Sequence, residues 1–186
     1  MTAAAWRNRL QATGMKRIYL LRHAKSSWSE DGQADYERGL APRGLHAARQ
    51  MSAHLRDRAV KPSVVLCSTA RRARETLDLI MPGLTGKPGI RYEDSLYQAA
   101  ASDIIARIKQ LPEKTASVMI VGHNPGLQET VLELAGAGAP KRMRQIAEKF
   151  PTLALAELST DIEHWRDLGP GAARLVDLTI PAEIED

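Results

Sequence analysis

The chain has 186 residues, which is enough for one domain with a short additional segment and for a core that needs no covalent cross-links. Hydrophobic residues make up 44% of it and charged residues 26%, which excludes a collagen-like, mucin-like or wholly disordered chain. The single cysteine, Cys67, excludes an internal disulfide framework and a cysteine-rich zinc site. A formal net charge of +4 favours anionic ligands but does not by itself indicate nucleic acid.

The first 14 residues contain no continuous apolar stretch of signal-peptide length. No apolar run in the chain approaches the roughly 18 residues that span a bilayer. We therefore expect residues 1–14 to be a flexible extension that precedes a single domain over residues 15–186. A cytoplasmic protein without membrane contact is the expectation that follows, and the sequence makes no prediction of oligomeric state.

Apolar runs and helical periodicities alternate along the chain. A short apolar run predicts a strand, and apolar residues three or four positions apart predict an amphipathic helix. In chain order, the patterns predict a strand over 18–21, a polar loop over 25–42, a helix over 43–58, a buried strand over 63–67, a helix over 70–80, a weaker strand over 89–92, a helix over 104–111, a strand over 117–121, a helix over 127–136, and two late strands over 153–158 and 175–180.

This alternation predicts an α/β fold, a three-layer αβα sandwich whose mostly parallel central sheet has helices on both faces. The two late strands are expected to pair as a hairpin at one edge of the sheet. The basic segment 141–149 is interpreted as the solvated face of a helix. A nucleic-acid partner is not expected, because the aromatic residues that stack on bases make up only 4% of the chain.

Basic and imidazole side chains follow three of the predicted strands. Ligands of open α/β sheets bind beyond the carboxyl ends of the strands, so these positions are expected to converge. Carboxylates do not cluster there, and oxygen-seeking ions such as Mg²⁺ or Ca²⁺ are therefore not expected as cofactors. The three segments are Arg22-His23-Ala24-Lys25, Ser68-Thr69-Ala70-Arg71-Arg72 and Gly122-His123-Asn124-Pro125-Gly126.

Paired histidines and arginines suit a phosphoryl group. Arginine forks match its oxygens bidentately and keep their charge, and a neutral imidazole can attack phosphorus and hold it covalently. A second imidazole can donate hydrogen bonds to the transition state, and a helix that begins near Pro125 adds positive potential. A structural role would explain either histidine taken alone. A phosphoryl site is favoured because histidines and arginines follow three separate strands. Cys67 is interpreted as a small buried side chain of its strand.

Five segments carry a family resemblance when they are taken together and in order. They are residues 19–26, with Ala24 after the Arg22-His23 pair, and residues 35–40, 66–76, 121–127 and 150–152. This series resembles the histidine phosphatase superfamily, which has the phosphoglycerate mutase-like fold, and more narrowly its SixA-type phosphohistidine phosphatases. The resemblance covers nearly the whole chain and implies a phosphatase that uses neither a metal nor an organic cofactor.

The resemblance also implies roles for individual residues. His23 would be the nucleophile that becomes phosphorylated, and Arg22 and Arg72 would bind the phosphate. His123 would complete the site, and Arg38 is a further candidate for a phosphate or substrate contact. Arg71, next to Arg72 in the sequence, is the less favoured of these two neighbours.

One departure from the family pattern bears on the substrate. Many superfamily members carry a glutamate that protonates the leaving group, whereas this chain has Gln98 in the matching stretch. An alkoxide leaving group needs such a proton, and a phosphorylated imidazole leaves more easily, so phosphohistidine on a partner protein is favoured. Glu93 and Asp94 remain alternative proton donors.

Two alternative functions remain: a small-molecule phosphomonoesterase or mutase, and a non-catalytic phosphate-binding module. The short connection between the second and third helices predicts an open site without a cap.

Overall fold

The computed structural model describes residues 15–28 and 32–184, so the expected extension over residues 1–14 lies outside the described part. The strands are β1 (Lys16–Arg22), β2 (Val64–Ser68), β3 (Gly89–Glu93), β4 (Ser117–Gly122), β5 (Ala135–Ala137), β6 (Leu155–Thr160) and β7 (Ala173–Thr179). The α-helices are α2 (Pro42–Asp57), α3 (Arg71–Ile80), α4 (Ala101–Lys109), α5 (Gly126–Leu134) and α6 (Pro140–Glu148). Five 3-10 turns are η1 (Asp35–Glu37), η2 (Met81–Gly83), η3 (Asp94–Leu96), η4 (Trp165–Asp167) and η5 (Pro181–Glu183).

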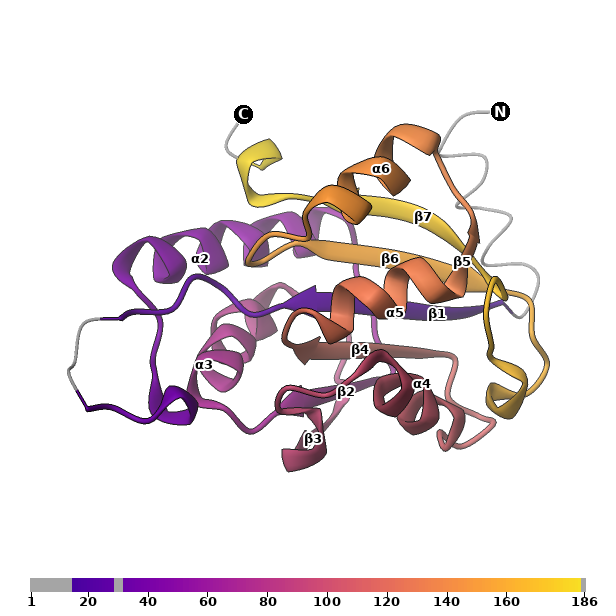
Figure 1. Ribbon diagram of the computed structural model, residues 1–186, viewed down its shortest axis with the longest axis horizontal. Helices are drawn as coiled ribbons and strands as arrows, with labels where there is room; N and C mark the ends of the chain where they lie inside the picture. The colour runs from indigo at the N-terminus through magenta and orange to yellow at the C-terminus, as the bar shows by residue number, and fades with distance from the viewer. Residues whose placement is uncertain (1–14, 29–31, 185–186) are drawn as a thin grey trace.

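The strands form one seven-stranded sheet in the order β3-β2-β4-β1-β6-β7-β5 (Figure 1). The pairs β3–β2, β2–β4, β4–β1 and β7–β5 are parallel, and β6 runs antiparallel to both β1 and β7. Among the described strands, β6 alone therefore runs against the others. The mostly parallel sheet is confirmed, and so is the antiparallel pairing of the two late strands.

Strand β5 corrects two of the expectations from the sequence. The helix predicted to continue to residue 136 ends at Leu134, and Ala135–Ala137 forms a short strand beside β7. This strand, and not the hairpin of β6 and β7, forms that edge of the sheet. A Cβ on Gly136 would overlap the carbonyl oxygen of Gly171, so the absence of a side chain lets β5 approach the connection before β7.

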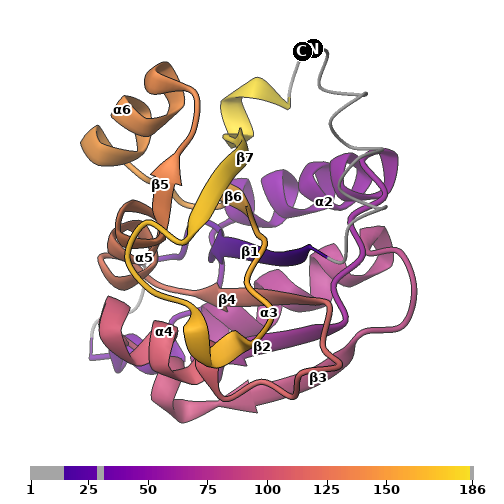
Figure 2. The same cartoon turned by 90° about the vertical axis from the view of Figure 1, so that its right-hand side faces the viewer.

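Helices cover both faces of the sheet, with α2 and α3 on one face and α4, α5 and α6 on the other (Figure 2). Successive residues of a strand point to opposite faces. In β1, Ile18 and Leu20 pack into the core on the α4–α5 side, and Tyr19 and Leu21 pack into the core under α2 and α3. Burial on both faces explains why the central strands are continuous apolar runs. The predicted three-layer αβα sandwich is confirmed.

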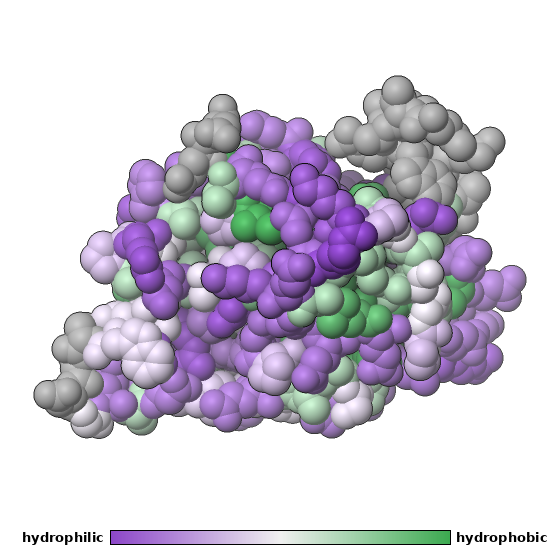
Figure 3. All heavy atoms as spheres, turned by 45° about the horizontal axis from the view of Figure 1, so that its top comes forward, coloured by the Kyte–Doolittle hydropathy of each residue, from purple (hydrophilic) through white to green (hydrophobic). Residues whose placement is uncertain are grey.

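The basic segment 141–149 lies mostly in α6, as a solvated helix. Within α6 only Ile146 is buried, and Arg142 forms an ion pair with Glu183 at 2.7 Å. The face of the molecule that carries α6 is mostly hydrophilic, with small hydrophobic patches between charged side chains (Figure 3). In the described part of the chain, none of the helices has the length and apolar character to cross a membrane.

The sheet brings three chain segments to the same edge. Strands β2, β4 and β1 are adjacent and parallel, and their register pairs Cys67 with Val121 and Arg22 with Gly122. The residues that follow each strand therefore leave the sheet side by side, where His23 and His123 come next in the sequence.

Candidate active site

His23 is the first residue after β1, and its neighbours fix both its backbone and its ring. Its backbone N–H donates to the carbonyl of Gly122 at 3.0 Å, and the N–H of Ala24 donates to the hydroxyl of Thr76 at 3.0 Å. The ring Nδ1 lies 2.7 Å from the carbonyl oxygen of Ala24. A carbonyl only accepts hydrogen bonds, so Nδ1 carries the proton and Nε2 keeps its lone pair.

Arg72 contacts this lone pair of His23, and the ring of His123 lies beside the ring of His23. The Nε of Arg72 donates to Nε2 of His23 at 3.3 Å, and the two imidazole centroids are 5.1 Å apart. Arg72 Nη2 also lies 3.4 Å from Nδ1 of His123. Because a guanidinium only donates, Nδ1 of His123 accepts, and its Nε2–H donates to the hydroxyl of Ser68 at 2.8 Å. The two rings therefore have defined and complementary tautomers.

Burial keeps both imidazoles uncharged. Desolvation lowers the pKa of His23 to about 3, and the nearby Arg72 and Arg22 reinforce the shift against the opposing hydrogen bond to Ala24. Desolvation, followed by the charge of Arg72, lowers the pKa of His123 to about 4. At neutral pH, His23 is therefore in the form of imidazole that acts as a nucleophile.

Arg22 is the last residue of β1 and faces the same region. Its Nη1 donates to the carbonyl of Phe150 at 2.8 Å, which ties β1 to the turn before β6. Its Nε is buried and has no hydrogen-bond partner among the described residues. Burial, followed by the charge of Arg72, lowers the pKa of Arg22. A buried donor without a partner next to a second arginine is suited to bind an oxyanion.

A cavity of about 240 Å³, here called the central cavity, opens in front of these groups. Typical small-molecule pockets are about 300–1,000 Å³, so this cavity fits a phosphoryl group and the atoms next to it. In the described part of the chain, no three His, Cys, Asp or Glu side chains are grouped as a metal site requires. The central cavity is lined by Arg22, His23, Lys25, Ser26, Trp28, Asp35, Arg38, Arg72, Gln98, His123, Asn124 and Thr152, which include all five site residues expected from the sequence.

Asp35 adds a single carboxylate to the site that the strand-end positions did not include. Its Oδ2 accepts hydrogen bonds from Arg72 Nη2 at 2.9 Å and from the Tyr97 hydroxyl at 2.8 Å. Partial burial raises its pKa, but hydrogen bonds from Tyr97, Arg72 and Arg38 outweigh that effect and lower the pKa to about 2. The strand-end rule missed Asp35 because it comes from the loop after β1. Asp35 stands three residues before Arg38 in one of the segments that resemble the family, and this position is the sequence feature that could have identified it.

Arg38 lines the central cavity, and each of its three guanidinium nitrogens already donates a hydrogen bond within the protein. It donates to Asp35 Oδ1 and to the Ser26 hydroxyl, each at 2.7 Å, and to the carbonyl of Ser27 at 2.9 Å. Its guanidinium also lies 3.6 Å from the centre of the Trp28 ring. These contacts indicate that Arg38 positions Asp35 and the loop around it.

Two other sequence candidates lie outside the central cavity. Arg71 forms an ion pair with Glu75 at 2.7 Å and is half-exposed, so Arg72 and not Arg71 reaches the histidines. Cys67 is fully buried, and burial raises the pKa of its thiol to about 12. This inert thiol agrees with the structural interpretation.

Gln98 lines the central cavity, and the two carboxylates considered as alternative proton donors do not. Glu93 accepts two hydrogen bonds from Arg107, at 2.7 and 2.8 Å. Asp94 accepts a hydrogen bond from the hydroxyl of Thr69. Among the described residues, the one carboxyl group on the cavity wall is therefore the ionised Asp35.

Comparison with known proteins agrees with this geometry. The model of the histidine phosphatase superfamily (branch 1) matches residues 18–98. An uncharacterised protein of Mycobacterium tuberculosis is 37% identical over 163 residues, which cover 87% of this chain and 99% of that protein. The structure of a proposed phosphohistidine phosphatase, SixA, from Agrobacterium tumefaciens is 32% identical with a TM-score of 0.76 and covers 89% of this chain and 98% of its own. For a proposed SixA from Nakamurella multipartitia the identity is 29%, the TM-score 0.77 and the coverage 90% and 96%. The chain therefore belongs to the histidine phosphatase superfamily and is of the SixA type.

Proposed function

We propose that this protein removes a phosphoryl group from a histidine of a partner protein, through a covalent phosphohistidine on His23. Membership in the superfamily supports phosphatase activity. The observation that carries the choice of substrate is the state of the cavity carboxylate. With a pKa of about 2, Asp35 holds no proton at neutral pH for a departing alkoxide. A phosphorylated imidazole needs no such donor when its second ring nitrogen is protonated.

The first step is an in-line transfer of the phosphoryl group. The lone pair of His23 Nε2 attacks phosphorus, and the bond from phosphorus to the substrate imidazole breaks. The bonding electrons stay on the substrate nitrogen, and the ring leaves as neutral imidazole with the proton that it already carried. The carbonyl of Ala24 holds the Nδ1 proton of His23 throughout the transfer. A water molecule then attacks phosphorus, and the bond from phosphorus to Nε2 of His23 breaks with its electron pair on nitrogen. The protons of the water leave with inorganic phosphate, and neutral imidazole is restored on His23.

The surrounding groups stabilise the charge on the transferring phosphoryl group. Arg22 and Arg72 supply fixed positive charge and directed donors for its equatorial oxygens. Before substrate binds, Arg72 donates to the lone pair that attacks, so oxyanion binding must draw its guanidinium towards the phosphoryl oxygens. His123 stays neutral, and its Nδ1 accepts from Arg72 Nη2 at 3.4 Å, so it orients that guanidinium beside the transferring phosphoryl group.

The test compares substrate classes with one enzyme preparation. A protein phosphorylated on histidine, p-nitrophenyl phosphate and a sugar phosphate are offered to the wild type, His23→Ala and His46→Ala. His46 is an exposed histidine of α2 and serves as the matched control. We expect kcat/KM to be at least about a hundredfold higher for the phosphohistidine protein than for the sugar phosphate. This is the factor by which the loss of a general acid slows a reaction that needs one. Equal rates on the two classes, or equal activity of His23→Ala and the wild type, would refute the proposal.

A further inference from the structure

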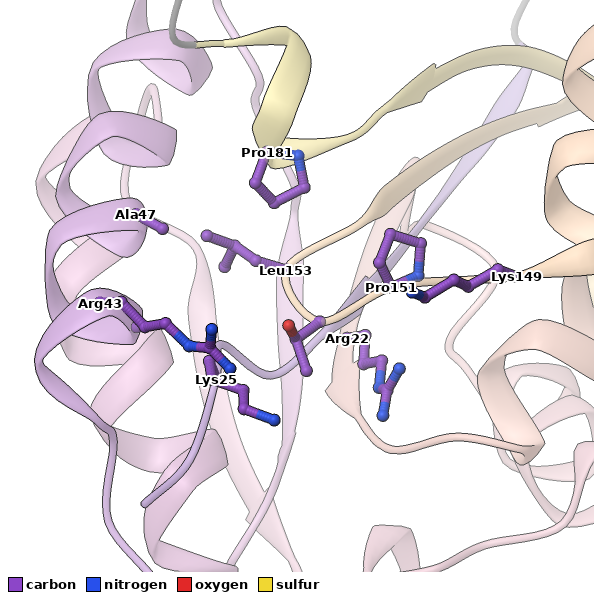
Figure 4. Close-up of a pocket in the computed structure, with 10 residues that line it drawn as sticks. Arg22, Lys25, Arg43, Ala47, Lys149, Pro151, Leu153 and Pro181 are labelled. Atoms are coloured by element: carbon purple, nitrogen blue, oxygen red, sulfur yellow. The ribbon is translucent and has the colours of Figure 1, made fainter. Parts of the chain in front are cut away.

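A second cavity adjoins the central cavity, and no step of the proposed reaction uses it. Its volume is about 470 Å³, about twice that of the central cavity at about 240 Å³. The two cavities share Arg22, Lys25 and Thr152 on their walls, so they lie next to each other. We call this cavity the basic trough, and its lining is Arg22, Lys25, Arg43, Gly44, Ala47, Lys149, Pro151, Thr152, Leu153 and Pro181 (Figure 4).

Four cations from separate chain segments line the basic trough, and none of its described lining residues is acidic. Lys25 and Arg43 lie together on one side, and Arg22 and Lys149 lie across from them (Figure 4). Arg22 belongs to β1, Lys25 to the loop after it, Arg43 to the first turn of α2 and Lys149 to the end of α6.

Three of these cations have no ionic partner in the described part of the chain. No Asp or Glu there forms an ion pair with Lys25, Arg43 or Lys149. Some other cations of the described part are paired, as Arg58 is with Asp177 at 2.7 Å, so the trough is distinguished by the gathering of its cations around one cavity. The gathering of unpaired cations leaves a field that attracts anions.

The walls of the basic trough are fixed to the segment that carries His23. The N–H of Ala41 donates to the carbonyl of Lys25 at 2.9 Å, and a Cβ on Gly44 would overlap that same oxygen. On the other wall, the N–H of Leu153 lies 3.1 Å from the carbonyls of both Arg22 and His23. A group bound in the trough is therefore held at a set position relative to the ring of His23.

Apolar side chains form the rest of the lining. Leu153 is buried, Ala47 and Pro181 are partly buried, and Pro151 lies beside them in Figure 4. A small inorganic ion would contact the cations and leave these apolar surfaces uncovered. A polypeptide segment with an acidic side chain next to apolar ones would use both parts of the lining.

We propose that the basic trough binds acidic side chains of the protein that presents its phosphohistidine to His23. This inference rests on the proposed function and adds a substrate preference to it, for phosphohistidines with glutamate or aspartate nearby. The preference comes from charges outside the reacting atoms, so it acts through substrate binding. An exposed ion pair contributes little by itself, so we expect the pairs at Arg43 and Lys149 together to change kcat/KM roughly fivefold.

The first experiment measures this preference by turnover. Peptides with one phosphohistidine carry glutamate at one of several flanking positions, and each has a glutamine counterpart. The wild type should favour at least one glutamate peptide by roughly fivefold in kcat/KM, and in Arg43→Gln/Lys149→Gln that ratio should fall to near one. The control Arg49→Gln/Lys114→Gln removes the same charge from exposed positions outside the trough and should keep the wild-type ratio. A ratio near one in the wild type, or an unchanged ratio in Arg43→Gln/Lys149→Gln, overturns the inference.

The second experiment does not depend on phosphatase activity. A fluorescein-labelled peptide with several glutamates and no phosphate is titrated with each protein, beside its glutamine counterpart, and anisotropy is followed. We expect Arg43→Gln/Lys149→Gln to bind the glutamate peptide roughly fivefold more weakly than Arg49→Gln/Lys114→Gln. Equal affinities of these two variants overturn the inference even if phosphohistidine is the substrate. If the glutamate peptide binds through the trough but no phosphohistidine peptide is turned over, the trough binds acidic side chains as inferred and the proposed function is refuted.

Discussion

At the scale of single residues, the site depends on which ring nitrogens carry protons. The carbonyl of Ala24 fixes the proton of His23 on Nδ1, and Arg72 and Ser68 fix the proton of His123 on Nε2. The sequence pointed to both histidines because residues that follow parallel strands converge, and the family resemblance favoured Arg72 over Arg71. The sequence could not show the tautomers, because they depend on hydrogen bonds from other segments. Ser68 lies at the end of β2, in one of the three segments singled out, and was missed as a partner of His123.

The lowered pKa values of the histidines predict the pH dependence of the reaction. Histidine with an unperturbed pKa of about 6.5 is mostly charged at pH 5. His23, with a pKa of about 3, and His123, with a pKa of about 4, are both neutral there. We therefore expect kcat/KM, corrected for titration of the substrate, to stay level between about pH 7 and pH 5. Initial rates at constant ionic strength check this, and an acid limb near pH 6.5 would contradict a neutral nucleophile.

The hydrogen bond between Ser68 and His123 predicts how strongly kcat depends on a fixed tautomer of His123. Replacing Ser68 by alanine removes the acceptor of the His123 Nε2 proton, so the ring can turn or change tautomer. We expect kcat to fall by on the order of ten- to a hundredfold, which is the rate loss that a small displacement of a reacting group causes. Steady-state kinetics measures the fall, and Ser52→Ala, which replaces a buried serine of α2, is the control. Equal activity of the two variants would show that the Ser68 contact is not needed.

At the scale of elements, the long and doubly buried strands were predictable, and the shortest strand was not. β4 appears in the sequence as a continuous apolar run because both of its faces are covered. β5 consists of Ala135, Gly136 and Ala137, which carry no strand pattern, and it exists because β7 offers a parallel edge. The loop that carries Asp35 has no periodicity either, so its return to the central cavity is visible only in three dimensions.

The packing of α2 against the loop after β1 predicts a stability effect. A Cβ on Gly44 would overlap the carbonyl oxygen of Lys25, so Gly44→Ala must push the helix away from the segment that carries His23. We expect a loss of about 1–3 kcal/mol in the free energy of unfolding, and a lower activity with it. Gly89→Ala is the control, because a Cβ there meets nothing within 4 Å. Thermal unfolding of both variants checks this, and equal midpoints would contradict the close contact.

At the scale of the whole molecule, the sheet order decides which distant residues meet. Residues 141–149 were interpreted from the sequence as a solvated helix face, and α6 confirms this for most of them. Lys149, at the end of that segment, instead lines the basic trough with Arg43 and Lys25. That meeting depends on β6 lying beside β1, and the sequence placed the late strands only as an edge hairpin. Strand type was therefore predictable from local pattern, whereas strand order was not.

The ends of three strands meet at the central cavity, so we expect an oxyanion bound there to stabilise the whole fold. A ligand at about a hundred times its dissociation constant adds about 2.7 kcal/mol, and for a chain of this size each kcal/mol raises the melting temperature by about 2–4 °C. Tungstate or phosphate should therefore raise the melting temperature by about 5–10 °C. Arg72→Ala should lose most of this shift, and Arg71→Ala, which removes a neighbouring cation outside the cavity, should keep it. The same shift in both variants would contradict the central role of Arg72.

The central claim is that His23 carries the phosphoryl group during turnover. The most direct measurement is to quench the reaction with labelled substrate in alkali and to locate the label on the protein by mass spectrometry. The account predicts a phosphate that is stable to base and labile to acid, on His23, and its loss in His23→Ala together with turnover. A label on another residue, or a His23→Ala variant that still turns over, would contradict it.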